Sequence, residues 1–166
     1  MRPKFGGLRG HWALRLASIR QMPRQARSNL DDGFFHVTAR ATGGERLFRG
    51  DLDLVDFVDL LSSTSGQFLW HCDTYCLMGT HYHLIVRSSR EALSAGMQRL
   101  NGVYAQRFNR RHERRGHLFE ARFSAWVVRN ERHLEAARNY VLENPVRAGL
   151  CERPDDWPWS ASAHAV

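Results

Sequence analysis

The amino-acid sequence predicts an α+β fold of the ferredoxin-like, split βαβ type, in which an antiparallel sheet carries helices on one face. Two periodicities lead to this prediction. Short runs alternate apolar and polar residues with the period of a strand, and longer runs repeat apolar residues at helical spacing. Their order along the chain is βαββαβ, followed by a C-terminal helix.

The first strand and helix open the predicted domain. Phe34–Arg40 alternates and contains β-favouring residues, and the turn-like ATGGE follows it. From Asp51 to about Ser63, apolar residues recur at helical spacing behind an aspartate that can cap the first turn. The predicted domain therefore begins with a strand followed by a helix.

Three further strands are predicted. Phe68–Leu77 and His81–Ser88 are strand-like runs, and Met78-Gly79-Thr80 between them is typical of a hairpin turn. Phe123–Arg129 is the fourth strand of the sheet.

A long helix separates the hairpin from the fourth strand, running from about Glu91 to Glu113. Either Ser88, with Glu91 as a capping box, or Ser94 could open it. Arginines crowd its C-terminal portion, where cations complement the helix dipole, and Gly116 ends it.

The composition is that of a soluble, single-domain globular protein. The chain has 166 residues, of which 43% are hydrophobic and 25% charged. No apolar run approaches the roughly 20 residues of a membrane helix, so a membrane protein is excluded. The odd number of cysteines (Cys72, Cys76 and Cys151) argues against a secreted disulfide framework and favours the cytoplasm.

The net charge of +7 suggests an acidic partner, most simply nucleic acid, although a preference for arginine also arises in GC-rich genomes. Residues 1–27 carry seven bases and no acid, and we interpret them as a basic leader that is disordered or lies upstream of the true start. Residues 28–166 then form a single domain. Within it, residues 31–60 have a net charge of −4 and residues 99–132 a net charge of +6.

Two histidines share one face of a predicted strand. In His81-Tyr82-His83 the period of two places both imidazoles on the same side, where they can hold one metal ion. A zinc site that adds Cys72 and Cys76 is the alternative. Residues four apart on an extended strand are separated by about 13 Å, so both thiolates could not bind one zinc unless that strand breaks.

The last predicted helix, Glu131–Glu143, carries Tyr140, with Asn144 four residues later on the same face. A helical tyrosine usually packs in the core or on the surface. The residue before a proline avoids the helical conformation, so Asn144-Pro145 is most simply a helix stop. These residues alone do not demand catalysis.

Four blocks occur in an order and spacing that resemble a known family: MGTHYHLIV (78–86), MQRLNGVYAQRFNRRHERRGHLFEARF (97–123), YVLENPVRAGL (140–150) and ERPDDWPWS (152–160). The sequence is similar to the REP-associated tyrosine transposases, a branch of the HUH single-tyrosine transposases. One departure is Met78-Gly79-Thr80, where that family usually has Met-Pro-Asn.

The resemblance implies a bacterial enzyme that nicks and rejoins single-stranded or hairpin DNA. It implies that His81 and His83 bind a divalent metal, Mg²⁺ or Mn²⁺, with Asn144 as third ligand, and that Tyr140 is the nucleophile of a 5′-phosphotyrosine intermediate. The base that deprotonates Tyr140 stays open between Glu120, His133, Glu143 and water.

The expected partner is single-stranded or hairpin DNA, and the protein is expected to be a monomer or homodimer. Arginine contacts phosphates well and stacks on bases. The residues expected to bind DNA are Arg99, Arg107, Arg110, Arg111, Arg114, Arg115 and Arg122. The alternative function is a domesticated DNA-binding protein of the same fold that no longer cuts.

Overall fold

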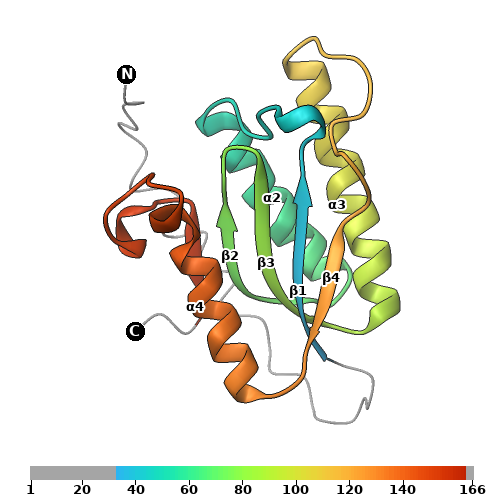
Figure 1. The fold of residues 1–166 in the computed structure, drawn as a ribbon. Coiled ribbons are helices and arrows are strands. Elements are labelled where there is room, and N and C mark those ends of the chain that lie inside the picture. Colours follow the sequence, from blue (N-terminus) through green and yellow to red (C-terminus); the bar gives the residue numbers. More distant parts are fainter. Residues whose placement is uncertain (1–32, 164–166) are drawn as a thin grey trace.

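A single antiparallel sheet organises residues 33–163, which are the residues that the computed structural model describes (Figure 1). The strand order is β4-β1-β3-β2-β5. The strands are β1 (Gly33–Arg40), β2 (His71–Leu77), β3 (His81–Ser88), β4 (Ser124–Val128) and β5 (Ser160–Ser162). The helices are α2 (Asp51–Gln67), α3 (Arg90–Arg111) and α4 (Glu131–Arg147), with short 3-10 turns at Thr42–Gly44 and Pro154–Asp156. The predicted basic leader lies outside the described residues.

The two faces of the sheet are covered differently. Helices α2 and α3 pack together on one face, where Phe57, Leu100 and Tyr104 meet the strand residues Val37 and Leu84 in the larger core. Helix α4 lies on the opposite face (Figure 1), where a second, smaller core joins Cys76, Ile85, Leu134, Ala137 and Val141. The predicted α+β class is confirmed. Helices α2 and α3, which lie within the βαββαβ order, share one face of the sheet, and the trailing helix α4 packs on the other.

The alternation of β3 assigns its side chains to the two cores. Tyr82 and Leu84 face α2 and α3, while Ile85 faces α4. His81 and His83 have the parity of Ile85 and therefore point to the α4 face. The antiparallel pairing with β1 sets Thr38 opposite His83 and Arg40 opposite His81.

The predicted boundary between the first helix and the second strand is wrong. Helix α2 continues to Gln67 instead of ending near Ser63, and β2 begins at His71 instead of Phe68. The helix ends where the Phe68 amide donates to Thr64 O, and Leu69 turns the chain with a φ of 55°. The apolar residues Phe68 and Leu69 thus belong to a helix end, which alternation alone does not distinguish from a strand.

The long helix also differs from the prediction at both ends. Ser89, rather than Ser88 or Ser94, caps α3 by accepting a hydrogen bond from the Ala92 amide at 3.2 Å. The helix ends at Arg111 instead of Glu113. Gly116, at a φ of 87°, lies in the loop beyond the helix and does not end it.

Helix α4 does not stop at Asn144-Pro145, as the sequence predicted, but runs through to Arg147. Pro145 lacks an amide and so removes only the bond to Val141 O. The next turn still closes, since the Ala148 amide donates to Asn144 O at 3.0 Å. Gly149, at a φ of 66°, then ends the helix.

The C-terminal block adds a short strand that the sequence did not predict. Strand β5 pairs with β2 and covers one edge of the sheet. Next to it, the Trp157 indole donates to Leu77 O at 3.0 Å, and the Leu77 amide donates to Trp159 O at 2.9 Å. Among residues 33–163, no helix has the length and apolar character needed to cross a bilayer.

Candidate active site

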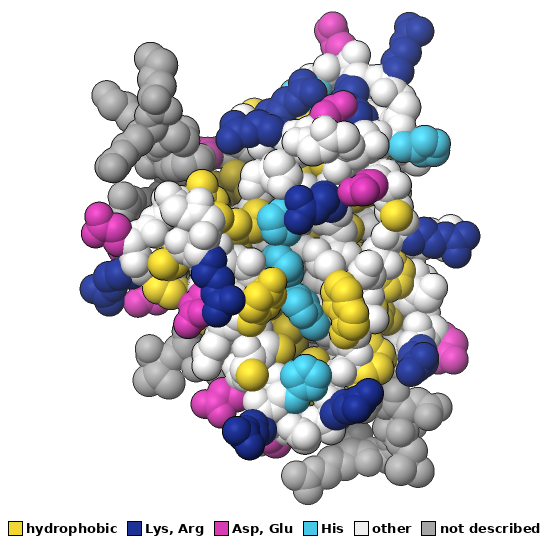
Figure 2. Space-filling model, in the orientation of Figure 1, with side chains coloured by type: hydrophobic (Ala, Val, Ile, Leu, Met, Phe, Trp, Pro, Cys, Tyr) yellow, Lys and Arg dark blue, Asp and Glu magenta, His cyan; other side chains and the backbone are white. Residues whose placement is uncertain are grey.

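A row of histidine side chains crosses the α4 face of the sheet (Figure 2). The rings of His81 and His83 lie 5.0 Å apart, centroid to centroid, as expected for residues two apart on one strand. His36, on the neighbouring strand β1, continues the row, with its ring 5.2 Å from that of His83. Three imidazoles from two strands thus form one cluster.

Both histidines of β3 are hydrogen-bonded through the same ring nitrogen. Thr80 Oγ1 lies 3.1 Å from His81 Nδ1, and His36 Nε2 lies 3.0 Å from His83 Nδ1. No partner is present for His83 Nε2 among the described residues, although this atom is buried. A buried nitrogen without a partner is unusual, and this makes His83 Nε2 a candidate atom for binding a ligand.

The cluster is held in the neutral state. Burial, followed by the nearby His81, His36 and Arg40, lowers the pKa of His83 to about 3. Burial and Arg40 lower the pKa of His81, and burial and His133 lower that of His36. Neutral imidazole is the form that binds metal ions.

Tyr140 reaches the cluster from α4. Its ring lies 5.9 Å from that of His83 and 5.9 Å from that of His36, edge-on to both. The side chain remains 41% exposed, so an external reactant can approach its hydroxyl. The Arg147 guanidinium lies over the ring, 5.3 Å from its centroid.

Asn144 lies one turn beyond Tyr140 on the same flank of α4. Its Nδ2 donates to Tyr140 O at 2.8 Å, which directs the amide nitrogen back to the helix and leaves Oδ1 as the free end of the side chain. Helix α4 runs toward the end of the sheet at which β3 begins (Figure 1).

A buried ion pair fixes α4 on the sheet. Arg138 donates from Nε and Nη2 to the two oxygens of Asp73, at 2.8 and 2.6 Å. Asp73 is fully buried at a bulge of β2, and Arg138 projects from the opposite flank of α4 to Tyr140. The ion pair and the smaller core together set the height of Tyr140 over the histidines.

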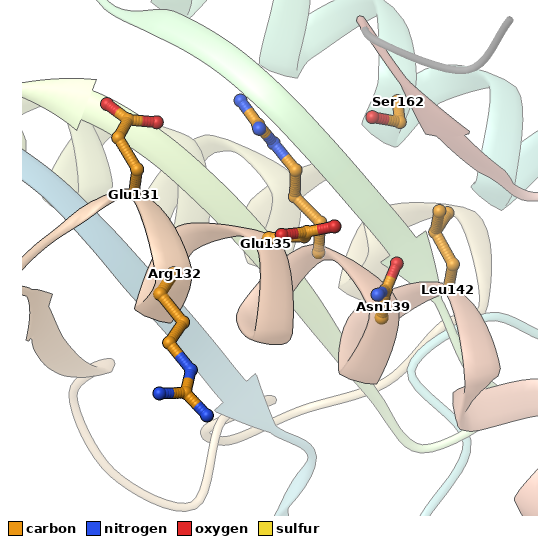
Figure 3. Close-up of a pocket in the computed structure, with 7 residues that line it drawn as sticks. Glu131, Arg132, Glu135, Asn139, Leu142 and Ser162 are labelled. Atoms are coloured by element: carbon orange, nitrogen blue, oxygen red, sulfur yellow. The ribbon is translucent and has the colours of Figure 1, made fainter.

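The flank of α4 that carries Arg138 borders an open pocket (Figure 3). It is lined by Glu131, Arg132, Glu135, Arg138, Asn139, Leu142 and Ser162. Tyr140 and Asn144 do not line it, so the pocket is separate from the histidine cluster.

Three residues of the site were not predicted from the sequence: His36, Arg40 and Arg147. His36 and Arg40 share the α4 face of β1. Trp126 of β4 stands beside His36, with its ring 5.6 Å away and its side chain 55% exposed. The alternation of Phe34–Arg40 does place His36 and Arg40 opposite Phe35 and Val37, but only the strand register brings them to His83.

The alternative zinc site is not formed. The register shift between Cys72 and Thr74 sends Cys72 into the α2/α3 core, while Cys76 faces α4. Over residues 33–163 there is no group of three or more His, Cys, Asp or Glu side chains that could hold a metal ion. Any metal at the histidines would therefore need a ligand of another type, such as the Asn144 amide oxygen.

Three of the predicted DNA-binding arginines are used in ion pairs at the end of the α2/α3 layer. Arg107 binds Asp56 at 2.7 Å, and Arg111 binds Asp53 at 2.6 Å and Asp56 at 3.0 Å. Arg114 binds Glu45 at 2.8 Å. The positive segment 99–132 thus compensates the negative segment 31–60.

The other predicted arginines differ in their surroundings. Arg110, Arg115 and Arg122 are exposed and form no ion pair with the described residues. Arg99 is half-buried on α3, and no partner for its Nε is found in the described part of the chain. None of the seven belongs to the histidine–tyrosine cluster.

The sequence matches the family model of IS200-like transposases over residues 32–144. The chain belongs to this family. It is therefore a DNA transposase, and DNA is its partner. The matched segment includes His36, His81, His83, Tyr140 and Asn144. No curated protein matches the chain significantly.

Two solved structures support the fold of this transposase. One is a REP-associated tyrosine transposase bound to a REP hairpin, with a TM-score of 0.67, 15% sequence identity and coverage of 84% of this chain and 82% of the other. The second is a transposase candidate from Deinococcus radiodurans R1, with a TM-score of 0.50, 16% identity and coverage of 74% and 97%.

Proposed function

We propose that the transposase cuts and rejoins single-stranded or hairpin DNA, with Tyr140 as the nucleophile and a divalent metal, Mg²⁺ or Mn²⁺, bound by His81, His83 and Asn144. One observation carries the proposal: the half-exposed ring of Tyr140 lies against those of His83 and His36, and His83 has a buried Nε2 without a partner among the described residues. A structural histidine would have this nitrogen paired or exposed to water.

The donor atoms suit a divalent ion. The Nδ1 atoms of His81 and His83 are already engaged, so their Nε2 atoms remain for the metal, and Asn144 presents an amide oxygen. Two imidazoles and one amide carry no charge, so the full charge of the cation is kept for the substrate. When bound, a divalent cation there would neutralise and polarise the scissile phosphate.

The proposed reaction is a transesterification at phosphorus. The Tyr140 Oη forms a bond to the scissile phosphate, and the bond from phosphorus to the 3′ oxygen breaks, leaving a 3′-hydroxyl and a 5′-phosphotyrosine. The phenolic proton is lost to solvent, and the leaving oxygen takes up a proton. Because one ester replaces another, a 3′-hydroxyl can reverse the step and rejoin DNA without an external energy source.

The surroundings of Tyr140 fit a DNA strand. Arg40 and Arg147 place positive charge beside the cluster, where they can contact phosphates next to the cut. Trp126 offers an exposed ring on which an unpaired base can stack. The solved REP-associated transposase bound to a REP hairpin makes a hairpin the first substrate to test. Arg110, Arg115 and Arg122 remain proposed contacts for more distant phosphates.

The test is covalent capture of DNA. A labelled single-stranded hairpin oligonucleotide is incubated with Mg²⁺ or Mn²⁺ and with wild type, Tyr140→Phe or the matched control Tyr75→Phe, a buried tyrosine on β2. We expect a denaturant-resistant adduct for wild type and Tyr75→Phe, and none for Tyr140→Phe. Hairpin binding without any adduct, with either metal, would contradict the proposal and indicate a binding-only protein.

A further inference from the structure

The hydrogen bond between His36 and His83 joins two imidazoles on adjacent strands. His36 Nε2 lies 3.0 Å from His83 Nδ1, and the two residues are 47 apart in sequence. His36 is fixed from two further sides by Trp126 and by Tyr140. Its ring is thus part of the packed cluster rather than a free surface side chain.

The direction of this hydrogen bond decides what His83 can bind. A neutral imidazole carries one proton, on either Nδ1 or Nε2. If His36 donates, His83 must carry its proton on Nε2, and that nitrogen then has no lone pair for a metal. If His83 donates from Nδ1, the lone pair of its Nε2, the buried nitrogen that has no partner among the described residues, is free to bind a metal.

We infer that His36 accepts the hydrogen bond from His83 Nδ1 and so holds the tautomer and ring orientation in which His83 Nε2 binds the metal. The inference rests on the metal site of the proposed function. It makes His36 a positioning residue, which acts through His83 and does not itself touch the metal.

The other two proposed ligands are arranged in a similar way. Thr80 Oγ1 is placed to accept from His81 Nδ1, and the Asn144 amide donates its nitrogen to Tyr140 O. In each case the atom that is not needed for a metal is held by a neighbour, and the ligating atom is left free. Such outer partners typically change metal affinity by about 10- to 100-fold.

The test uses Mn²⁺ alone, with binding followed by electron paramagnetic resonance of the free ion. His36→Phe keeps a flat ring but cannot accept a hydrogen bond, whereas His36→Gln can present Oε1 near the position of Nε2. We expect Mn²⁺ affinity to fall about 10- to 100-fold in His36→Phe and to stay within about 3-fold of wild type in His36→Gln. His117→Gln, an exposed histidine in the loop after α3, is the control and should bind like wild type.

A second readout does not depend on affinity. Long-range ¹H–¹⁵N spectra of the Mg²⁺-loaded protein should show the His83 proton on Nδ1. Circular dichroism and thermal unfolding establish that the variants are folded.

The possible failures can be told apart. If wild type binds Mn²⁺ and His36→Phe binds it equally well, or if His36→Gln is as weak as His36→Phe, the inference about His36 is wrong while the metal site stands. If wild type binds no Mn²⁺, the metal site of the proposed function is wrong and the inference falls with it.

Discussion

The α2/α3 helix layer and the α4 face of the sheet each carry a cluster of polar side chains, and the clusters differ in how far their hydrogen bonds are satisfied. On the α2/α3 side, Asp53 is 1% exposed and accepts from the Arg49 amide, from Arg111 at 2.6 Å and from His112 at 2.9 Å. On the α4 side, His83 is almost as buried, yet its Nε2 has no partner in the described residues. The Asp53 carboxylate is thus paired on both oxygens, whereas one nitrogen of His83 is left without a hydrogen bond to the described residues.

The two clusters also differ in the cause that dominates their pKa shifts. Burial raises the pKa of Asp53, but its hydrogen bonds to Arg49, His112 and Arg111 outweigh this and hold the pKa below its usual value. The charge is therefore kept and paired. In the histidine cluster burial dominates and lowers the pKa of all three rings, that of His83 to about 3. The Asp53 cluster therefore stabilises the fold, while the histidine cluster is the one to which the proposed function assigns the metal.

The largest expected effect is on cleavage. His81→Ala should reduce adduct formation by at least about 100-fold, because the metal loses one of two imidazole ligands. Hairpin affinity, measured by fluorescence anisotropy, should change by less than about 3-fold. Equal loss of cleavage and binding would show that this histidine is structural and would remove the distinction between the clusters.

The next effect is on stability. Asp53→Ala should lower the free energy of unfolding by about 2–4 kcal/mol, because Arg111 and His112 lose their shared partner and the first turn of α2 loses its bond to the Arg49 amide. Urea denaturation measures the change. Asp155→Ala, which breaks an exposed pair with Arg153, should have less than about 0.5 kcal/mol of effect.

The pH dependence checks the same carboxylate. Its lowered pKa means that Asp53 stabilises the fold above the unfolded pKa of about 3.9, and that this contribution is lost as pH falls through the folded pKa. The urea midpoint should therefore decline less between pH 5 and pH 2 in Asp53→Asn than in wild type. Parallel declines would mean that Asp53 carries no charge-dependent stability.

A smaller effect is expected at the rim of the histidine cluster. Trp126→Ala should weaken binding to single-stranded DNA by about 1–3 kcal/mol if a base stacks on this ring. Leu69→Ala, an exposed apolar residue in the turn between α2 and β2, is the control and should leave affinity unchanged. Equal affinities for wild type and Trp126→Ala would place the strand elsewhere.

The smallest effect separates the arginines by their partners. Arg110→Gln and Arg115→Gln should each reduce the slope of log affinity against log salt by about 0.7, the value for one phosphate contact to a single strand. Arg107→Gln and Arg111→Gln should leave the slope unchanged, because these side chains already neutralise Asp56 and Asp53. Titrations at several salt concentrations make the comparison.

The difference between the faces also explains what could be predicted from the sequence. His81 and His83 could be proposed as metal ligands because the period of a strand is local, and Tyr140 and Asn144 could be assigned roles because they lie in a block that resembles a known family. His36 joins His83 across 47 residues, and Arg111 joins Asp53 across 58, so both contacts depend on strand register and helix packing. The arginine-rich segment looked like a DNA surface because its acidic partners lie so far away in the sequence.

The predicted end of α4 was wrong for a related reason. Asn144-Pro145 is a local stop signal, but α4 continues to Arg147, with Val141 in the smaller core and Pro145 buried. Asn144 thus stays in helical register with Tyr140, and its proposed role as a ligand depends on this register.

The most direct test of the central claim is the position of the covalent bond to DNA. Wild-type protein is trapped on a hairpin oligonucleotide, the adduct is digested with nuclease and trypsin, and mass spectrometry locates the nucleotide-modified residue. The account predicts a phosphotyrosine-linked nucleotide on Tyr140. A nucleotide on any other residue would contradict the assignment of the α4 face as the site of cleavage.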